Sequence, residues 1–475
     1  MTGNVFTRDM GYELLTRARG NGAELRSVVV RQGGEIVFEH AAAPFPLDHV
    51  HPLYSVTKSF TSVAVGMMVE EGPIQLDRPW IEWFPEYEPA IADERFRRVT
   101  VRHLLTMTMG QDAEPYVTGD DDWALGVVAK PLAHEPGTVF LYNSLCTHLL
   151  SMLVQRVSGQ TVEDLLARRL FAPLGISRWW WEQDRHGHSV GGFGLHLSTP
   201  DLAKFGQCLL DGGAWCGEQL IPAQWVREAT SKQVETEPFY PAAATEDRNG
   251  YGFQYWMCAG GGYRCAGLFG QLCYVRPEDG LVVAASSSTT GSKALLDPLY
   301  QVLGGEESKP CFDRQVLDEL PTIAGSPLSA WAARVAGRHA LAPNAGGFDA
   351  FEVRFPDDSL MELALFRGDR VYRVEAGFDR WHRSADNGTQ GIGEIFPFAT
   401  HGAECDEAPA WDNRDVYACY AWTTPSTLEL WVRELDYTRR THVKLVLDGQ
   451  HVVMTLGVES MYCGIRPSEY MVATC

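Results

Sequence analysis

The chain has 475 residues, with 61 acidic and 40 basic side chains and a formal net charge of −21. This acidity argues against nucleic acids and anionic membrane surfaces as partners. The length predicts two domains, and 45% hydrophobic with 21% charged residues is typical of a globular protein with a sizeable core.

No stretch is long and apolar enough to predict a transmembrane helix, and the first ten residues lack the basic-then-apolar pattern of a signal peptide. The eleven cysteines are an odd number, and no two of them are spaced Cys-x-x-Cys. We therefore expect reduced thiols in a cytoplasmic protein, with neither a disulfide framework nor a zinc site.

The first 300 residues predict an α+β domain, with strands at both ends and helices between them. Apolar periodicity and capping residues predict helices at 8–19, 55–69, 100–110, 144–157, 161–171, 199–211 and 291–303, and one that opens at Pro222. Alternating and β-branched runs predict strands at 27–31, 35–39, 251–257, 262–268, 271–276 and 281–287. Residues 111–131, which include Tyr116, Asp120 to Asp122 and Trp123, are expected to form a long surface loop of the kind that often binds ligands.

The pattern changes after about residue 325, where short strands alternate with turns and no long helical periodicity is present. The expected strands are 336–342, 351–355, 360–366, 370–375, 416–423, 427–434, 440–447 and 450–456. We expect the α+β domain at 1–309, a linker at 310–327 and an all-β, barrel-like domain at 328–475.

Ser55 and Lys58 are the strongest candidates for chemistry. They lie three residues apart at the start of the apolar helix, so their side chains can meet on one face. A serine hydroxyl needs a base to become a good nucleophile, and burial favours the neutral, basic form of a lysine amine. Taken alone, the pair is more simply explained by a helix N-cap followed by an exposed lysine.

Further sequence motifs along the chain favour a catalytic role for this pair over a simple helix cap. Ser55-Val-Thr-Lys58, Tyr142-Asn143-Ser144 and Cys265-Ala266-Gly267 occupy the places of the three motifs of serine β-lactamases and penicillin-binding proteins. The chain resembles this superfamily over about residues 25–305, and most closely its class C β-lactamase-like esterases and amidases. The resemblance implies a β-lactamase/transpeptidase-like fold, an antiparallel sheet flanked by helices, followed here by a barrel or lipocalin-like all-β domain.

The same resemblance implies acyl transfer without a cofactor. Ser55 would attack a carbonyl, Lys58 would accept the serine proton, and Tyr142 would pass a proton to the leaving group. The backbone N–H groups of Ser55 and Leu268 would form the oxyanion hole, reinforced by the helix dipole at Ser55.

Two departures from the family pattern bear on the substrate. Ser144 stands where asparagine is usual, and Cys265 replaces the lysine or histidine that holds a substrate carboxylate. We therefore expect a neutral small ester or amide, bound near Ser144, Cys265, Ala266 and Gly267. Trp123 and Trp181 are further candidates for the substrate site, although core packing explains Trp181 equally well.

His186 and His188 flank a glycine and suggest a metal, but the sequence shows no third ligand, so we predict no metal site. Several alternatives remain open. A D-amino-acid peptidase or β-lactamase would need another cation, for which Arg264 is a candidate. A peptide-cyclising transacylase and a non-catalytic binding or sensor protein are also possible. The sequence does not indicate an oligomeric state.

Overall fold

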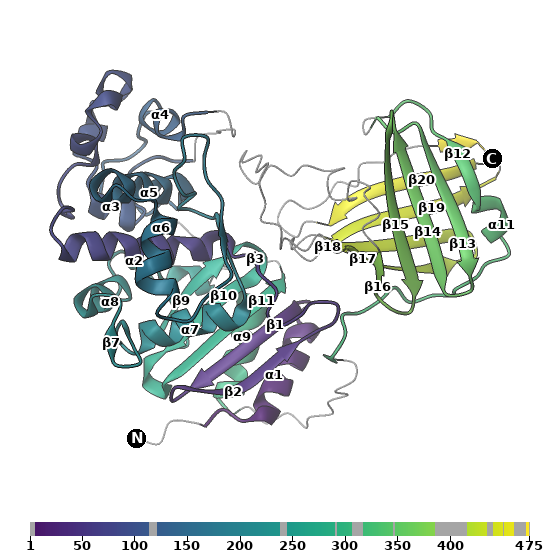
Figure 1. Cartoon of the computed structure of the whole chain (residues 1–475), viewed down its shortest axis with the longest axis horizontal. Coiled ribbons are helices and arrows are strands. Elements are labelled where there is room, and N and C mark those ends of the chain that lie inside the picture. Colours follow the sequence, from purple (N-terminus) through teal and green to yellow (C-terminus); the bar gives the residue numbers. More distant parts are fainter. Residues whose placement is uncertain are drawn as a thin grey trace. The chain divides into compact units, whose positions relative to one another are not determined.

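The computed structural model describes residues 5–113, 121–237, 245–289, 292–305, 317–344, 347–384, 416–434, 440–449, 451–459 and 472–474. The described chain divides into two compact units (Figure 1). The first unit holds the described residues up to 305, apart from Ala42–Pro46. The second unit holds the described residues from 317 onward together with Ala42–Pro46.

The first unit is built from helices and short strands. Its α-helices are α1 (Arg8–Gly20), α2 (Thr57–Glu70), α3 (Val101–Leu105), α4 (Trp123–Val128), α5 (Ser144–Ser158), α6 (Val162–Leu166), α7 (Thr199–Leu210), α8 (Ala223–Ala229) and α9 (Lys293–Leu303). Its strands are β1 (Glu24–Gln32), β2 (Glu35–Ala41), β3 (His51–Pro52), β4 (Trp180–Trp181), β5 (Leu195–Leu197), β6 (Ala214–Trp215), β7 (Glu218–Gln219), β8 (Trp256–Met257), β9 (Tyr263–Gly267), β10 (Gln271–Arg276) and β11 (Leu281–Ser288).

An antiparallel sheet forms the base of this unit, with six described strands in the order β2-β1-β11-β10-β9-β8. Successive side chains of β1 point to opposite faces, so Val29 joins the main core while Val28 and Val30 face the other way. Helix α7 packs on β1, β10 and β11, whereas α1 packs on β1, β2 and α9. The β1–β2 hairpin is therefore joined to the four strands β8 to β11 in one sheet.

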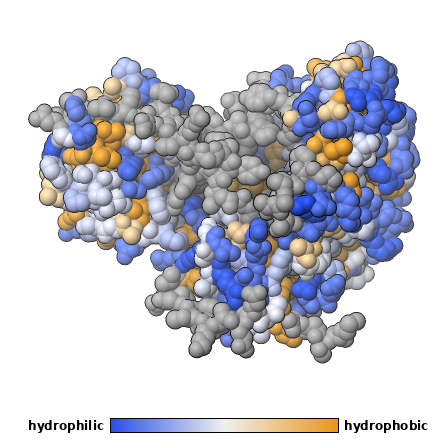
Figure 2. All heavy atoms as spheres, turned by 180° about the vertical axis from the view of Figure 1, so that it is seen from behind, coloured by the Kyte–Doolittle hydropathy of each residue, from blue (hydrophilic) through white to orange (hydrophobic). Residues whose placement is uncertain are grey.

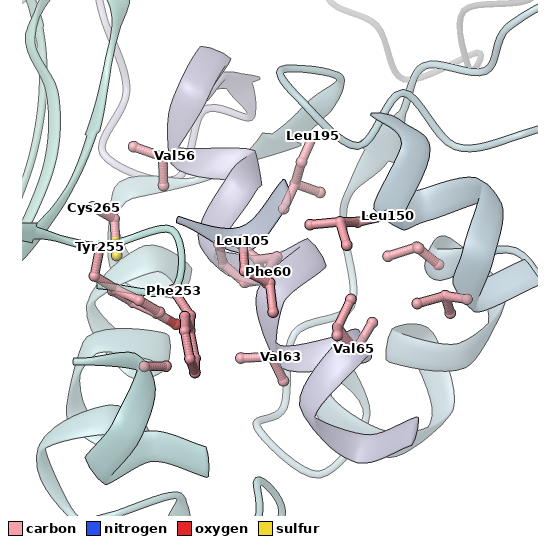
Figure 3. Close-up of a cluster of buried hydrophobic side chains, with 14 of the residues drawn as sticks. Val56, Phe60, Val63, Val65, Leu105, Leu150, Leu195, Phe253, Tyr255 and Cys265 are labelled. Atoms are coloured by element: carbon pink, nitrogen blue, oxygen red, sulfur yellow. The ribbon is translucent and has the colours of Figure 1, made fainter. Parts of the chain in front are cut away.

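Helix α2 runs through the middle of the main core, and every residue from Thr57 to Met68 is buried. Figure 3 shows Val56, just before α2, and the α2 side chains of Phe60, Val63 and Val65. They lie among side chains from several other segments, including Leu150, Leu195 and Phe253. A Cβ on Gly66 would overlap the ring of Trp225 on α8, so this glycine permits the close approach of the two helices.

The second unit consists mainly of one curled antiparallel sheet (Figure 1). Its described strands are β12 (Gly337–Ala340), β13 (Ala350–Asp357), β14 (Leu360–Arg367), β15 (Arg370–Phe378), β16 (His382–Ser384), β17 (Val416–Thr424), β18 (Thr427–Glu434), β19 (Arg440–Asp448), β20 (His451–Glu459) and β21 (Val472–Thr474). The short α11 (Ala332–Val335) precedes them, and β15 pairs in parallel with β17. A separate apolar core fills this unit.

Ala42–Pro46 belongs to the second unit although it lies early in the chain. The Ala43 amide donates to the Asp318 carbonyl at 2.8 Å, and the Leu320 amide donates to the Ala43 carbonyl at 2.9 Å. The side chains of Ala42, Phe45 and Leu320 form a small buried cluster. Nothing in the sequence pattern predicts this pairing.

Most predicted elements of the first unit are present, with adjusted ends. The expected N-cap and capping-box residues Thr100 and Thr161 do cap α3 and α6. The prediction of a strand over 251–257 is wrong for its first part, because Gln254 has a left-handed backbone (φ +73°) and only Trp256–Met257 is a strand. The predicted stop at Gly110 is also wrong, since α3 ends at Leu105.

The described surface is mainly hydrophilic on the face drawn in Figure 2, with apolar patches between polar areas. Large hydrophobic side chains that are clearly exposed include Val5, Ile36, Leu125, Leu328 and Trp331. No helix in the described ranges combines the length and apolar character needed to cross a membrane.

Replacing Gly66 by alanine should destabilise the first unit, because the new methyl group would overlap Trp225. Overpacking of this kind costs about 1–3 kcal/mol in free energy of unfolding. Gly20→Ala is the matched control, because a Cβ there meets nothing within 4 Å. Urea unfolding of the two variants measures the difference, and equal midpoints would contradict the close packing.

Candidate active site

Ser55 sits where a turn of 3-10 helix, Tyr54–Val56, leads into α2. It is half-buried, whereas Tyr54 before it and Val56 after it are buried. Tyr54 adopts a left-handed backbone (φ +48°), which is costly for a bulky residue and is concentrated at functional sites. The strain is therefore placed one residue before the candidate nucleophile.

The Lys58 amine lies inside the protein, with the residue only 1% exposed. Its Nζ donates to Ser55 Oγ at 3.0 Å, to Ser144 Oγ at 3.1 Å and to the Gly192 carbonyl at 2.8 Å. These acceptors come from three separate segments of the first unit. These oxygen atoms thus take the place of the water molecules that the amine loses when it is buried.

Two glycines allow the chain after β4 to approach α5 so closely that the Gly192 carbonyl can accept a hydrogen bond from Lys58. A Cβ on Gly192 would lie 2.6 Å from the Ser144 carbonyl oxygen, and one on Gly191 would lie 2.7 Å from the Thr147 carbonyl oxygen. Any larger residue would push this segment away from α5. Sequence reasoning missed the Gly192 carbonyl as a partner of Lys58, although the Gly191-Gly192 pair was visible as a signal of close approach.

Tyr142 is positioned just ahead of α5. Its ring lies 4.9 Å from Lys58 Nζ, and it stacks on Trp256 with ring centroids 5.5 Å apart. Asn143 caps α5 by accepting the Leu145 amide at 2.9 Å, so its side chain has a local structural role. The structure therefore brings Ser55, Lys58, Tyr142 and Ser144 together.

The end of β9 borders the Ser55 backbone. A Cβ on Gly267 would overlap the Leu53 carbonyl oxygen and lie 3.3 Å from Ser55 N. Leu268 follows, and Phe269 after it has a left-handed backbone (φ +61°). The rings of Tyr54 and Phe269 meet edge to face at 5.3 Å, so the two strained residues support one another.

Three residues that we assigned to the substrate site lie in the core instead. Cys265, Trp123 and Trp181 are each at most 2% exposed and belong to the main apolar cluster. Trp181 donates its indole N–H to the Val190 carbonyl, and Trp123 packs against His148. For Trp181, the structure supports the alternative interpretation as a core residue, whereas the assignment of Cys265 and Trp123 to the substrate site is wrong. Ala266 and Gly267 are half-buried beside Ser55.

Arg264 cannot serve as the cation suggested above. Its side chain is fully buried, and it bonds to Asp247 at 2.6 Å and to the Glu246 and Met257 carbonyls at 3.2 Å. Its guanidinium is also 5.4 Å from the centre of the Trp256 ring. The positive charge of Arg264 is therefore paired with Asp247 inside the protein and is not available to a substrate.

The prediction of a surface loop over 111–131 is wrong for its second half, because Trp123–Val128 form α4 and bury apolar side chains. Asp120 and Tyr116, named in that prediction, lie outside the described residues.

The segment that leads to Gly192 carries a buried acid. Glu182 follows β4, and its backbone pairs with Gly194 and Val190 at 2.9 and 2.8 Å. Burial raises the pKa of its carboxyl to about 8, and its Oε2 has no hydrogen-bond partner among the described residues. Glu182 therefore holds a proton at neutral pH and acts as a neutral buried group.

One group in the described chain has the composition of a metal site, namely His148, Asp184 and His188. Hydrogen bonds from the two imidazoles lower the pKa of Asp184 well below its usual range, although burial acts in the opposite direction. The cluster is separate from the residues around Ser55 named above.

An antiparallel sheet packed with helices, and a Ser-x-x-Lys pair opening a buried helix, define the class of penicillin-binding-protein-like serine hydrolases. The chain belongs to the Beta-lactamase family, whose sequence profile matches residues 19–305. The family assignment confirms the resemblance drawn from the motifs, and places the protein among enzymes.

Three of the similar curated proteins have names that denote hydrolases. The 6-aminohexanoate-dimer hydrolase of Paenarthrobacter ureafaciens is 28% identical over 287 residues, which are 55% of this chain and 71% of that protein. Esterase EstB of Burkholderia gladioli is 30% identical over 175 residues, covering 31% of this chain and 44% of the esterase. A D-aminopeptidase of Brucella anthropi is 28% identical over 163 residues, 32% of this chain and 31% of the peptidase.

A solved structure resembles nearly the whole chain. The octameric penicillin-binding protein homologue from Pyrococcus abyssi has a TM-score of 0.51 and 17% identity, and the match covers 98% of this chain and 99% of that one. A likeness at this identity bears on the fold. It supports the β-lactamase/transpeptidase-like fold of the first unit.

Replacing Glu182 by glutamine should flatten the pH dependence of stability. The folded carboxyl titrates at about 8 and the unfolded one near 4.5, so the folded protein keeps a proton that the unfolded chain releases between these values. Its contribution is fully present below about pH 4.5 and is lost as the pH rises through 8. Between about pH 5 and pH 8, wild type should lose roughly 3 kcal/mol more stability than Glu182→Gln.

Chemical unfolding at several pH values measures this difference. Glu70→Gln is the control, because Glu70 is exposed at the end of α2. Parallel pH profiles for wild type and Glu182→Gln would show that the buried carboxyl does not keep its proton.

Proposed function

We propose that the protein hydrolyses a small ester or amide through an acyl-enzyme on Ser55. The carrying observation is the 3.0 Å hydrogen bond between Ser55 Oγ and the buried amine of Lys58. The family supplies the coarser conclusion, a serine hydrolase of the β-lactamase fold. The proposal adds the residues and their order of action.

Lys58 is the proposed base. A base must lie within hydrogen-bond reach of the proton that it removes, and Lys58 meets this condition at Ser55. Its other acceptors, Ser144 Oγ and the Gly192 carbonyl, fix the amine in place. To act as the base the amine must be neutral, with its two protons donated to Ser144 Oγ and the Gly192 carbonyl and its lone pair accepting the Ser55 O–H. The serine proton then passes to Nζ as Oγ attacks the substrate carbonyl.

Tyr142 is the proposed partner in proton transfer. Its ring faces the Lys58 amine, and Trp256 holds the ring by stacking. A phenol beside a lysine amine can share its proton and deliver it to the leaving group. The same pair can then activate the water that releases the acyl group.

The proposed oxyanion hole consists of the Ser55 and Leu268 amides. The approach of Gly267 to Ser55 N supports this pairing, and a left-handed residue lies next to each of the two amides. The N-terminus of α2 adds positive potential at the same place. A preorganised pair of donors is worth about 10²–10³ in kcat for each donor in other acyl-transfer enzymes.

The preference for neutral substrates rests on charge. Cys265 lies in the core and Arg264 is engaged with Asp247, so neither residue supplies a cation to a substrate carboxylate. A hydrogen bond to a charged group contributes about 1.5–3 kcal/mol, so the missing partner disfavours carboxylate substrates. β-lactam or D-peptide turnover and acyl transfer to amines are outcomes that the assays below distinguish.

For the second unit, we keep the closed, barrel-like all-β domain as a proposal, with the boundary between residues 309 and 328. Support comes from the curled sheet of β12 to β21. Among the described residues of this unit, helical structure is limited to short segments such as α11.

Ser55→Ala should abolish covalent labelling by a fluorophosphonate, because the probe reacts with an activated serine hydroxyl. Intact-mass spectrometry should find one adduct on wild type and none on the variant. Ser59→Ala is a useful control, since Ser59 is buried on the same helix and bonds to the Gln254 carbonyl. A folded wild type without an adduct would favour a binding protein and reject the hydrolase.

Tyr142→Phe should lower kcat for a neutral ester by about 10²–10⁴-fold, the usual contribution of a proton-transfer group, while the protein remains folded. Ser144→Ala removes one acceptor of Lys58 and should cost less, about tenfold. Esterase kinetics with both variants measure the two effects. A kcat of Tyr142→Phe close to that of wild type would show that Tyr142 does not take part in proton transfer.

A pair of aryl esters that differ by one carboxylate tests substrate charge. The neutral ester should have a kcat/KM about 10- to 100-fold higher, because the carboxylate finds no cation at the site. Benzylpenicillin should not be turned over. Faster hydrolysis of the carboxylate ester would overturn the preference, and diversion of the acyl group to added amines would identify a transacylase.

A further inference from the structure

His148, Asp184 and His188 converge from two parts of the first unit. His148 lies on α5, one turn after Ser144, and the other two residues lie in the loop between β4 and β5. His148 Nε2 is 3.1 Å and His188 Nδ1 is 2.9 Å from the same oxygen, Asp184 Oδ2. The three ligand atoms all lie within 4.8 Å of one another.

We propose that these three side chains bind a divalent transition-metal ion, with zinc as the best match. Imidazole nitrogens and a carboxylate oxygen are ordinary zinc ligands, and their metal distances of about 2.0–2.1 Å place neighbouring tetrahedral ligands about 3.3 Å apart. The observed 2.9 and 3.1 Å separations from Asp184 Oδ2 are close to this spacing, and the two imidazole nitrogens, which lie within 4.8 Å of one another, would adjust to it on binding. Two neutral imidazoles with one carboxylate also give the negative charge that a dication needs.

The loop holds Asp184 in a suitable orientation. Asp184 Oδ1 accepts the backbone amides of His186 and His188, each at 2.9 Å. This leaves Oδ2 facing the two imidazoles. Trp123 packs on the His148 ring with centroids 4.7 Å apart and restricts its rotation. Ligands held in this way lose little freedom when a metal binds.

Access to the ion is available on one side. His148 and Asp184 are buried, whereas His188 is half-buried, with 21% of its side chain exposed. A water molecule can therefore complete a four-coordinate shell from the His188 side. Three protein ligands plus water are a common zinc arrangement.

The metal would tie the loop to α5 just before Gly191 and Gly192. Ser151 of α5 already donates to the Ser189 carbonyl at 2.7 Å, and Thr61 of α2 donates to the Gly191 carbonyl at 2.9 Å. The next carbonyl, that of Gly192, accepts the Lys58 amine. A bound ion would thus stabilise the segment that holds Lys58, without contacting the reacting atoms.

The alternative is a cluster held by hydrogen bonds alone, in which each imidazole donates to Asp184. The two cases differ in zinc uptake. The test uses the full chain without an affinity tag, treated with a chelator, dialysed and titrated with zinc chloride. Native mass spectrometry gives the stoichiometry, and thermal unfolding gives the shift in Tm.

His188→Gln is the test variant, because its side chain is near the surface and its loss is least disruptive. His186→Gln is the matched control: His186 is exposed in the same loop, two residues away and outside the ligand group. Wild type and His186→Gln should bind one zinc ion and show a higher Tm with zinc. His188→Gln should bind at least about tenfold more weakly, as expected when a metal site loses part of its support.

Cobalt(II) provides a spectroscopic readout that does not depend on stability. The wild-type complex should show the strong visible bands of four-coordinate cobalt, and the His188→Gln complex should lack them. Failure of wild type to take up zinc or cobalt, or equal binding by His188→Gln, would overturn the metal site. The first result would assign the three residues to a hydrogen-bonded cluster.

Discussion

Lys58 carries an ionisable amine inside an apolar core, and burial of this amine is unfavourable unless oxygen atoms replace the lost water. Ser55, Ser144 and Gly192 supply these oxygens from three segments. The positions of α2, α5 and the chain after β4 are therefore linked through one nitrogen atom. Because a gap in this ring of acceptors would leave the amine unsatisfied, the same contacts that orient the amine also stabilise the fold.

Small residues make that convergence possible. Gly192 and Gly191 lie against α5, Gly267 lies against the Ser55 backbone, and Gly66 lies against Trp225. At each position a side chain would separate two segments that must touch. The apolar core supplies the free energy of folding, while these contacts determine how closely the segments around Ser55 approach.

The sequence predicted the parts of the site that are local. The spacing of Ser55 and Lys58 on one helix placed their side chains together, and the caps at Thr100 and Thr161 follow from residue type. The meeting of Tyr142 and Ser144 with Lys58 was expected only from the family resemblance, and other contacts between distant segments were not predicted. Gly192 meets Lys58 across 134 residues, and Asp184 meets His148 across 36. Cys265 was misplaced because a motif position does not reveal which face of a strand is buried, whereas core packing was already the alternative explanation for Trp181.

The segment Ala42–Pro46 is synthesised early but pairs with residues that are synthesised much later. It leaves the ribosome early, but its partners Asp318 and Leu320 follow about 270 residues later. Until then the Ala43 amide and the Phe45 side chain lack their native contacts, so the second unit cannot complete its packing from C-terminal residues alone. A chain that begins at residue 317 would expose Leu320 and lose two backbone hydrogen bonds. An isolated second unit would therefore need Ala42–Pro46, or a segment that replaces it, to complete its packing.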